Sequence, residues 1–215
     1  YNSKAIPIYK EILKSFEDIN SRINLAAAYN AQSQRDLAYQ ELKTAIEKNP
    51  GNPKPYSVLG RYQELDGKYK EAEANYRKAL DIDDKHAVSH FRLGRYLNSQ
   101  KRPNKEGLEH LKKAVELEPE VPEYIEELGM EYKRIGELSD SVDMLERLSV
   151  LQPDREDLYI LLGDMYTKIK FYQKAVERYW SALEFNDDNK HVHQSLRDIY
   201  QELIRIEEAK LKISF

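Results

Sequence analysis

Residues 52–85 read NPKPYSVLGRYQELDGKYKEAEANYRKALDIDDK, and this stretch decides the fold. Asn52 suits a helix N-cap and Pro53 a first helical residue, because proline lacks the backbone N–H that would have no partner there. Apolar residues then recur every three or four positions, as they do on one face of a helix. Gly67 interrupts this pattern, and glycine readily takes the left-handed conformation that closes a helix. The stretch therefore predicts a hairpin of two helices, one on each side of Gly67.

The same hairpin recurs along the chain with a period of about 34 residues. Each repeat contains a small residue preceded by leucine: Ala26, Gly60, Gly94, Gly129 and Gly163. A second small residue follows 12 or 13 positions later: Ala38, Ala72, Gly107, Ser141 and Ala175. Small residues at both stations would let the two helices of a hairpin approach closely. The period predicts an all-α fold of stacked antiparallel helix pairs, in which each pair is stabilised by its neighbours.

This repeat resembles the tetratricopeptide repeat, and the resemblance covers nearly the whole chain. Residues 59–80, LGRYQELDGKYKEAEANYRKAL, carry most of the family's signature positions. The chain departs from the family where a tryptophan is usual; successive repeats have Arg22, Tyr56, His90, Ile125 and Tyr159 there. The resemblance implies a right-handed α-solenoid, the superhelix of this family.

The resemblance also implies a single solenoid over residues 1–215. Five complete repeats are expected at 19–52, 53–86, 87–121, 122–155 and 156–189. Residues 1–18 are expected to form the second helix of a half-repeat. The last segment, 190–215, is expected to be another half-repeat or a capping helix, which stacked repeats need at their ends.

Composition and charge exclude several functions. The 34 Lys and Arg residues against 38 Asp and Glu give a net charge of −4, so nothing favours a nucleic-acid partner. No run of 18 apolar residues predicts a membrane span, and we expect no membrane insertion. The chain has no cysteine, which excludes disulfides, thiol catalysis and cysteine-based zinc sites. We expect a soluble protein, with the cytoplasm favoured over a periplasmic or other extracytoplasmic location.

Motifs for catalysis, metals and cofactors are missing. The spacing from Gly60 to Gly67-Lys68 is wrong for a phosphate-binding loop, and Tyr69 follows where serine or threonine is required. His86 and His90 are four residues apart, but neither an HExxH motif nor a third ligand accompanies them. We therefore predict a protein that is not an enzyme and has no metal or cofactor.

In the family that this chain resembles, the first helices of the repeats line a concave groove. The resemblance implies a track that is basic in its middle and acidic later, with Phe91, Met130 and Ile160 as apolar footholds. Such a surface suits an extended peptide or an amphipathic helix. The predicted groove residues are Ile23, Lys54, Arg61, Phe91, Arg92, Arg95, Glu126, Met130, Lys133, Ile160 and Asp164.

A second surface is indicated by the only tryptophan, Trp180. In the four preceding repeats its station is charged, with Lys43, Arg77, Lys112 and Glu146. This station is expected on the convex side. Trp180 either packs under the C-terminal helix or marks a contact with another chain.

We predict a non-catalytic protein–protein interaction module that binds a peptide or helix of a partner in its groove, within a larger assembly. The alternative is a structural scaffold that assembles through its convex face and its ends, with a homo-oligomer as one form. A third possibility is a regulatory subunit of an enzyme.

Overall fold

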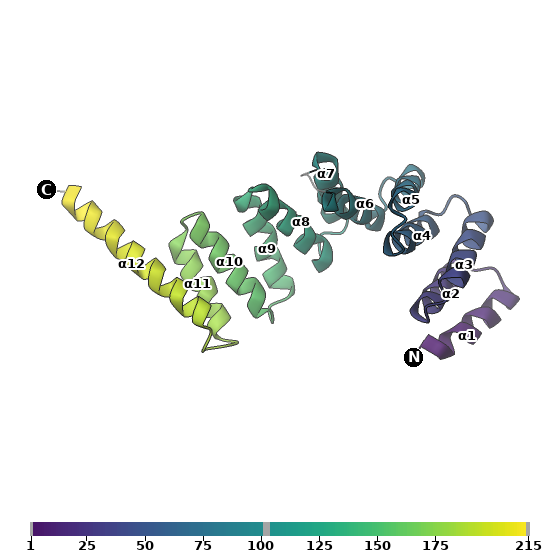
Figure 1. The fold of residues 1–215 in the computed structure, drawn as a ribbon, viewed down its shortest axis with the longest axis horizontal. Coiled ribbons are helices and arrows are strands. Elements are labelled where there is room, and N and C mark those ends of the chain that lie inside the picture. Colours follow the sequence, from purple (N-terminus) through teal and green to yellow (C-terminus); the bar gives the residue numbers. More distant parts are fainter. Residues whose placement is uncertain (1, 101–103, 214–215) are drawn as a thin grey trace. The chain divides into compact units, whose positions relative to one another are not determined.

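The computed structural model describes residues 2–100 and 104–213, and this part of the chain contains helices and turns but no strand. It forms two compact units, residues 1–118 and 119–215, and each is described by itself (Figure 1). The helices of unit 1 are α1 (Asn2–Ser15), α2 (Ile19–Ala31), α3 (Arg35–Lys48), α4 (Pro53–Leu65), α5 (Tyr69–Ile82), α6 (Ala87–Ser99) and α7 (Lys105–Leu117). Those of unit 2 are α8 (Pro122–Ile135), α9 (Leu138–Leu151), α10 (Glu156–Lys168), α11 (Tyr172–Leu183) and α12 (Lys190–Ile213).

The hairpin of α4 and α5 has the local structure that its sequence predicts. The side chain of Asn52 accepts a hydrogen bond from the Lys54 amide at 3.0 Å, and Pro53 is the first residue of α4. Gly67 has a φ of 74°, the left-handed conformation that L-residues with a side chain adopt at a cost. The predicted N-cap and turn are confirmed.

The turn after α4 has counterparts in three other hairpins. Ser33, Gly136 and Lys170 also have positive φ, at 61°, 86° and 62°. In each turn, the residue after the one with positive φ donates its backbone N–H to a carbonyl in the last turn of the first helix. After α4, for example, the Lys68 amide donates to the Gln63 carbonyl at 2.8 Å. This bond caps a free carbonyl at the end of the first helix. In these four hairpins, positive φ at one station is thus how the chain turns back to form a second helix.

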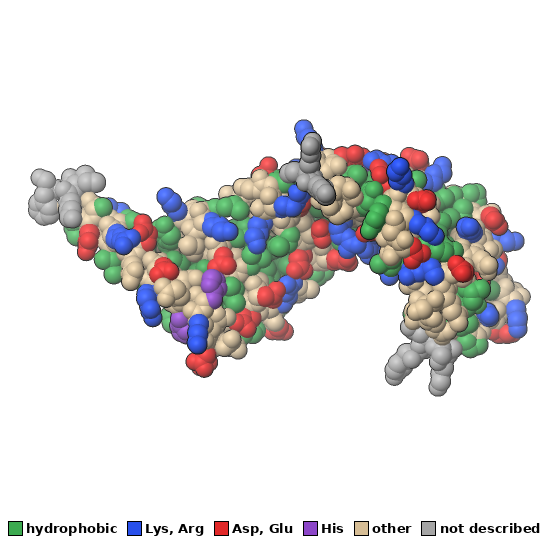
Figure 2. Space-filling model, in the orientation of Figure 1, with side chains coloured by type: hydrophobic (Ala, Val, Ile, Leu, Met, Phe, Trp, Pro, Cys, Tyr) green, Lys and Arg blue, Asp and Glu red, His purple; other side chains and the backbone are tan. Residues whose placement is uncertain are grey.

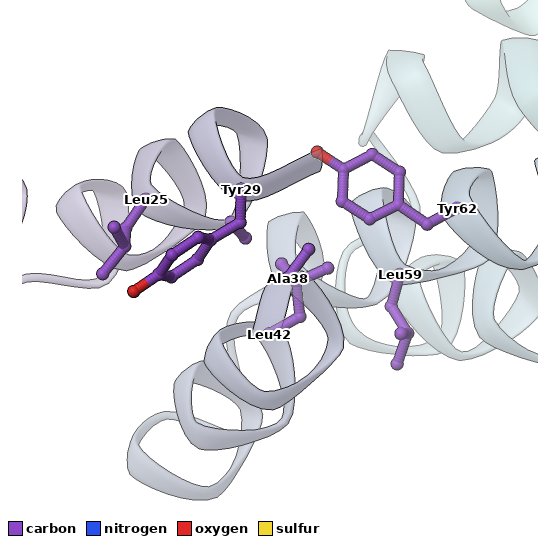
Figure 3. Close-up of a cluster of buried hydrophobic side chains, with 7 residues drawn as sticks. Leu25, Tyr29, Ala38, Leu42, Leu59 and Tyr62 are labelled. Carbon is purple, nitrogen blue, oxygen red and sulfur yellow. The ribbon is translucent and has the colours of Figure 1, made fainter. Parts of the chain in front are cut away.

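The core of unit 1 is built between successive hairpins. One cluster of buried side chains takes Leu25 and Tyr29 from α2, Leu42 from α3, and Leu59 and Tyr62 from α4 (Figure 3). The second helix of one hairpin therefore packs between its own first helix and the first helix of the next. The predicted all-α fold of stacked helix pairs is confirmed.

Small residues permit close helix crossings. A Cβ atom on Gly60 would lie 2.8 Å from the Tyr76 ring, closer than real side chains approach. In unit 2 the small residue on α9 is Ser141, whose buried hydroxyl donates to the Gly129 carbonyl of α8 at 2.6 Å. Both crossings are made at the stations that the period predicts.

The last helix, α12, differs from the other first helices in length. It has 24 residues, whereas α2, α4, α6 and α10 have 13 each. Val192, Leu196 and Ile199 are buried. None of the described helices, α12 included, is long and apolar enough to cross a membrane. The division into five repeats and two end segments within a single solenoid stays a prediction.

Candidate functional site

A pocket of about 490 Å³ opens on the first-helix face of unit 1, between α2, α4 and the start of α6. Ile23 and Val58 are half-buried and pack on the core cluster, so they form an apolar floor. Val88 of α6 adds an exposed apolar wall. The complete lining is Asn20, Ile23, Asn24, Lys54, Ser57, Val58, His86 and Val88.

Polar groups surround this apolar floor. Lys54 is exposed at the start of α4, and Asn20 and Asn24 are exposed on α2. The Ser57 side chain is buried, and its hydroxyl oxygen has no hydrogen-bond partner within the described chain. Buried polar atoms in proteins are normally paired, so the unpaired hydroxyl of Ser57 is an exception beneath the pocket surface.

His86 forms the α6 side of the pocket and caps the start of that helix. Its Nδ1 lies 2.7 Å from the Ser89 hydroxyl, which fixes the ring. Burial lowers the pKa of His86 below its ordinary value, since the charged imidazolium is disfavoured away from water. Near neutral pH the pocket therefore contains a neutral imidazole and one cation, Lys54.

The predicted basic residues of unit 1 lie on α4 and α6, and only Lys54 reaches the pocket. Arg61 is exposed, with its guanidinium 5.8 Å from the Tyr62 ring centre. Arg95 lies 3.4 Å from Glu64, so part of its charge is compensated within the chain. A basic track formed by these residues stays a prediction.

Phe91 is not the apolar foothold that the sequence predicts. Its side chain is only 1% exposed, and the guanidinium groups of Arg92 and Arg95 lie 5.4 Å and 5.7 Å from its ring centre. Long arginine side chains cover apolar surface with their stems while their charged ends stay in water. The foothold prediction for Phe91 is therefore wrong, because its own helix neighbours cover the ring.

The predicted acidic residues of unit 2 are engaged within the chain. Glu126 of α8 accepts two hydrogen bonds from Arg155, the residue that precedes α10, both at 3.0 Å. Asp164 accepts from the Tyr179 hydroxyl at 2.6 Å and lies 3.1 Å from His191 Nε2. Burial, with help from Asp164, raises the pKa of Tyr179 to about 12. These carboxylates hold helices together, so their charge is only partly offered to a partner.

The remaining predicted groove residues of unit 2 are Met130, Lys133 and Ile160. Met130 is exposed on α8, while Lys133 and Ile160 are half-buried. The structure brings Ile23 and Lys54 together around one pocket and leaves the other predicted residues outside it. Their role in binding stays a prediction.

Trp180 is 52% exposed on α11, and its indole Nε1 lies 3.5 Å from the Tyr200 hydroxyl of α12. It therefore touches the C-terminal helix without being covered by it. A contact with another chain through Trp180 stays a prediction.

The two histidines weighed as metal ligands have structural partners. His90 Nε2 lies 2.9 Å from the Asp84 carbonyl, which only accepts, so neutral His90 has its proton there. Its Nδ1 then accepts from His110 Nδ1 at 2.8 Å and joins α6 to α7. Across the described residues, no group of three or more His, Asp or Glu side chains could hold a metal ion.

Five pocket residues were outside the sequence prediction of groove positions. Val58, His86 and Val88, with Asn20 and Asn24 on the rim, do not occupy the stations that the family resemblance assigns to the groove. They reach the pocket because two successive first helices and the turn before a third converge there. The cue in the sequence is Val58 and Val88, apolar residues at helix positions that the repeat does not require.

Residues 53–86 match the family model described as tetratricopeptide repeat. The chain is 21% identical over 204 residues to anaphase-promoting complex subunit 3 of Schizosaccharomyces pombe. That alignment covers 79% of this chain and 30% of the subunit, so the chain spans less than a third of that relative.

Two solved structures have a similar fold. YrrB, described as a TPR protein with an unusual peptide-binding site, matches with a TM-score of 0.65 and 22% identity, over 88% of this chain and 97% of YrrB. A chain of the APC/C hetero-tetramer Cut9-Hcn1 matches with a TM-score of 0.67 and 15% identity, over 92% of this chain and 39% of that chain. At these identities the likeness is one of fold. With the repeat period and the helix pairs, residues 53–86 are a tetratricopeptide repeat, and the chain has the fold of tetratricopeptide-repeat proteins.

Proposed function

We propose that the chain is a non-catalytic interaction module that binds a peptide or helix of a partner protein on the first-helix face of unit 1. The observation that carries the proposal is the pocket beside Lys54. Its volume of about 490 Å³ is in the range of ligand sites in proteins. An apolar floor with a few polar groups around it suits an anchoring side chain of a peptide.

The lining indicates the chemistry of the segment that fits. Ile23, Val58 and Val88 favour a large apolar side chain. Lys54 favours an acidic group close to that anchor, because it is the one cation in the pocket lining and is exposed. Ser57 also belongs to the lining, but its hydroxyl oxygen is itself buried.

The relatives support this assignment. YrrB is described as having a peptide-binding site, and the Schizosaccharomyces pombe relative is a subunit of a larger complex. A chain with the same repeats and a built pocket on its first-helix face fits both descriptions. We extend to this chain only the binding of a protein segment, and we place it on the first-helix face because the pocket lies there.

The test is selection of peptides from a displayed random library on the folded chain, followed by affinity measurement by fluorescence polarisation. Lys54→Glu and Val88→Asp alter the pocket at exposed positions, so the fold should be retained. We expect each to weaken the selected peptides by about tenfold or more, since one reverses the charge and the other places a carboxylate on the apolar wall.

Matched controls are Lys78→Glu on α5 and Val150→Asp on α9, which are exposed and outside the pocket. They should leave the affinity unchanged. Peptides that bind Lys54→Glu and Val88→Asp as tightly as the wild type would place the binding surface elsewhere and contradict the proposal.

A second candidate function is a structural scaffold that joins copies of the chain. The exposed apolar residues of α12 in unit 2 favour it. Because the pocket belongs to unit 1, the two functions can be tested separately.

A further inference from the structure

Helix α12 begins as the first helix of a repeat does, yet two of its residues depart from the pattern. Counting 34 residues from Gly163 leads to Arg197, where the other first helices have glycine or alanine. Counting 34 from Lys170 leads to Ile204, at the station where the four described turns between hairpin helices have positive φ. Both departures lie within α12 itself.

Arg197 prevents a second helix from packing on α12 as in the other hairpins. At this station a Cβ on Gly94 would lie 2.8 Å from the Gly107 carbonyl, and one on Gly163 would lie 2.6 Å from the Tyr179 ring. An arginine has no room in a crossing that excludes a methyl group. Arg197 is accordingly exposed.

Ile204 explains why α12 continues instead of turning. The left-handed conformation is especially costly for a β-branched residue, whereas isoleucine fits a helix. The helix runs on through this station to Ile213. The face that other first helices bury under their second helix is therefore left uncovered on α12.

That face is one continuous stripe. It consists of six exposed residues spaced alternately by four and three: His193, Arg197, Tyr200, Ile204, Glu207 and Leu211. Such spacing keeps side chains on one side of a helix. Tyr200, Ile204 and Leu211 are 44%, 59% and 62% exposed. By contrast, Tyr29 and Tyr166, which occupy the station of Tyr200 in earlier repeats, are buried. Figure 2 shows charged side chains of both signs interleaved with apolar ones along α12.

We propose that this stripe pairs antiparallel with the stripe of α12 in a second copy of the chain. The spacing four, three, four, three, four reads the same in both directions, so all six positions meet in one register. In that register Tyr200 faces Ile204 of the other copy, Arg197 faces Glu207, and His193 faces Leu211. The two-fold axis makes every contact twice, as a dimer interface of identical surfaces requires.

Charge identifies a second copy as the occupant. Arg197 makes no ion pair in the described part of the chain; its contact is Gln194 at 3.4 Å. Glu207 pairs with Lys210 one turn away at 2.8 Å, an exposed pair that contributes little stability. The antiparallel register supplies each with an opposite charge on both sides of an apolar centre. Trp180, beside Tyr200, widens that centre.

The stripe spans about 28 Å of helix, since each residue advances the helix by about 1.5 Å. An interface of this size is small, so the dimer should form and dissociate with concentration. Sedimentation velocity of the whole chain over a concentration series measures its dissociation constant directly.

Charge reversal tests the register. Arg197→Glu and Glu207→Arg should each weaken dimerisation by about tenfold or more, because each sets like charges face to face twice. The double variant Arg197→Glu/Glu207→Arg should recover to within about threefold of the wild type. Residues ten apart on one helix do not touch, so recovery can come only from pairing between chains. Arg205→Glu, exposed on α12 but outside the stripe, is the matched control and should dimerise like the wild type.

A chain without cysteine allows a second measurement. Tyr200→Cys mixed with Ile204→Cys should form a mixed disulfide on mild oxidation, because the register brings these positions together. Parallel pairing would instead crosslink each variant with itself. Circular dichroism confirms that each variant is folded.

A chain that stays monomeric at every concentration overturns the proposal. So does a dimer that ignores both single reversals, or a double variant as weak as the singles. The result is independent of the pocket: Lys54→Glu should leave dimerisation unchanged, and Arg197→Glu should leave peptide binding unchanged.

Discussion

The hairpin of α4 and α5 and the long helix α12 begin with the same repeat pattern but end differently. In α4 the station of close approach is Gly60 and the turn station is Gly67, with a φ of 74°. In α12 the same stations are Arg197 and Ile204, and the helix continues. Val192, Leu196 and Ile199 of α12 are buried, as are the residues at the same stations of α4: Pro55, Leu59 and Tyr62. The two helices thus differ at the stations of close approach and of the turn, while these three buried stations agree.

Replacing Gly60, the residue at the station of close approach, should have the largest effect on the stability of the fold. Gly60→Arg places a side chain where even a Cβ would lie 2.8 Å from the Tyr76 ring, and it buries a charge. We expect a loss of about 3 kcal/mol or more in the free energy of unfolding. Urea denaturation followed by circular dichroism measures it.

The control for this exchange is Arg197→Ala, an exposed substitution on α12 that should change the stability by less than about 0.5 kcal/mol. Equal denaturation midpoints for Gly60→Arg and the wild type would mean that the crossing of α4 and α5 is not as tight as described.

Exchanging the turn residue should have a smaller effect. Gly67→Ile forces a β-branched side chain into the left-handed region and should cost about 1–2 kcal/mol. Gly67→Asn is the control, since asparagine tolerates this conformation. Thermal melting compares the three chains, and an isoleucine variant as stable as the asparagine variant would show that the turn station does not set the hairpin.

The smallest expected effect is a change in the stability of the α6–α7 hairpin with pH. Burial is the main cause that lowers the pKa of His110, and the neighbouring His90 and Arg77 lower it further. Glu106 acts in the opposite direction and raises this pKa. The unfolded chain therefore binds a proton at higher pH than the folded one, and stability falls as pH drops below about 6.5. We expect the loss from this group to stay below about 1 kcal/mol.

Replacement of His110 by glutamine should flatten this decline in stability between pH 7 and 5, measured by urea denaturation at each pH. Lys78→Gln, an exposed substitution on α5 that leaves every histidine in place, is the control and should keep the slope of the wild type. An unchanged slope in the His110 variant would contradict the assignment.

Much of the fold could be predicted because the sequence of each repeat contains the signals that start and end its helices. Asn52 and Gly67 mark the start and end of α4 through capping and backbone chemistry, which depend on local sequence alone. The turns at Ser33 and Lys170 follow from position in the period, since neither residue favours positive φ by itself. Repetition therefore carried information that single residues lack.

The candidate site was predicted less well, because side-chain partners depend on residues far along the chain. Glu126 is bound by Arg155, 29 residues later, and nothing near Glu126 in the sequence announces that bond. Phe91 is covered by Arg92 and Arg95, although its station was expected to face a partner. The pocket itself needs two first helices and the start of a third, so only Ile23 and Lys54 of the predicted set belong to it.

The exposed indole of Trp180 also provides an intrinsic fluorescence signal for unfolding and for pairing of copies. With a single tryptophan in the chain, indole emission comes from unit 2 alone, whereas circular dichroism follows the helices of both units. Comparing the two signals during unfolding tells whether the units melt together or one after the other. Because the indole lies beside Tyr200 at the edge of the stripe, the same emission should shift to shorter wavelength when copies pair and water leaves the ring.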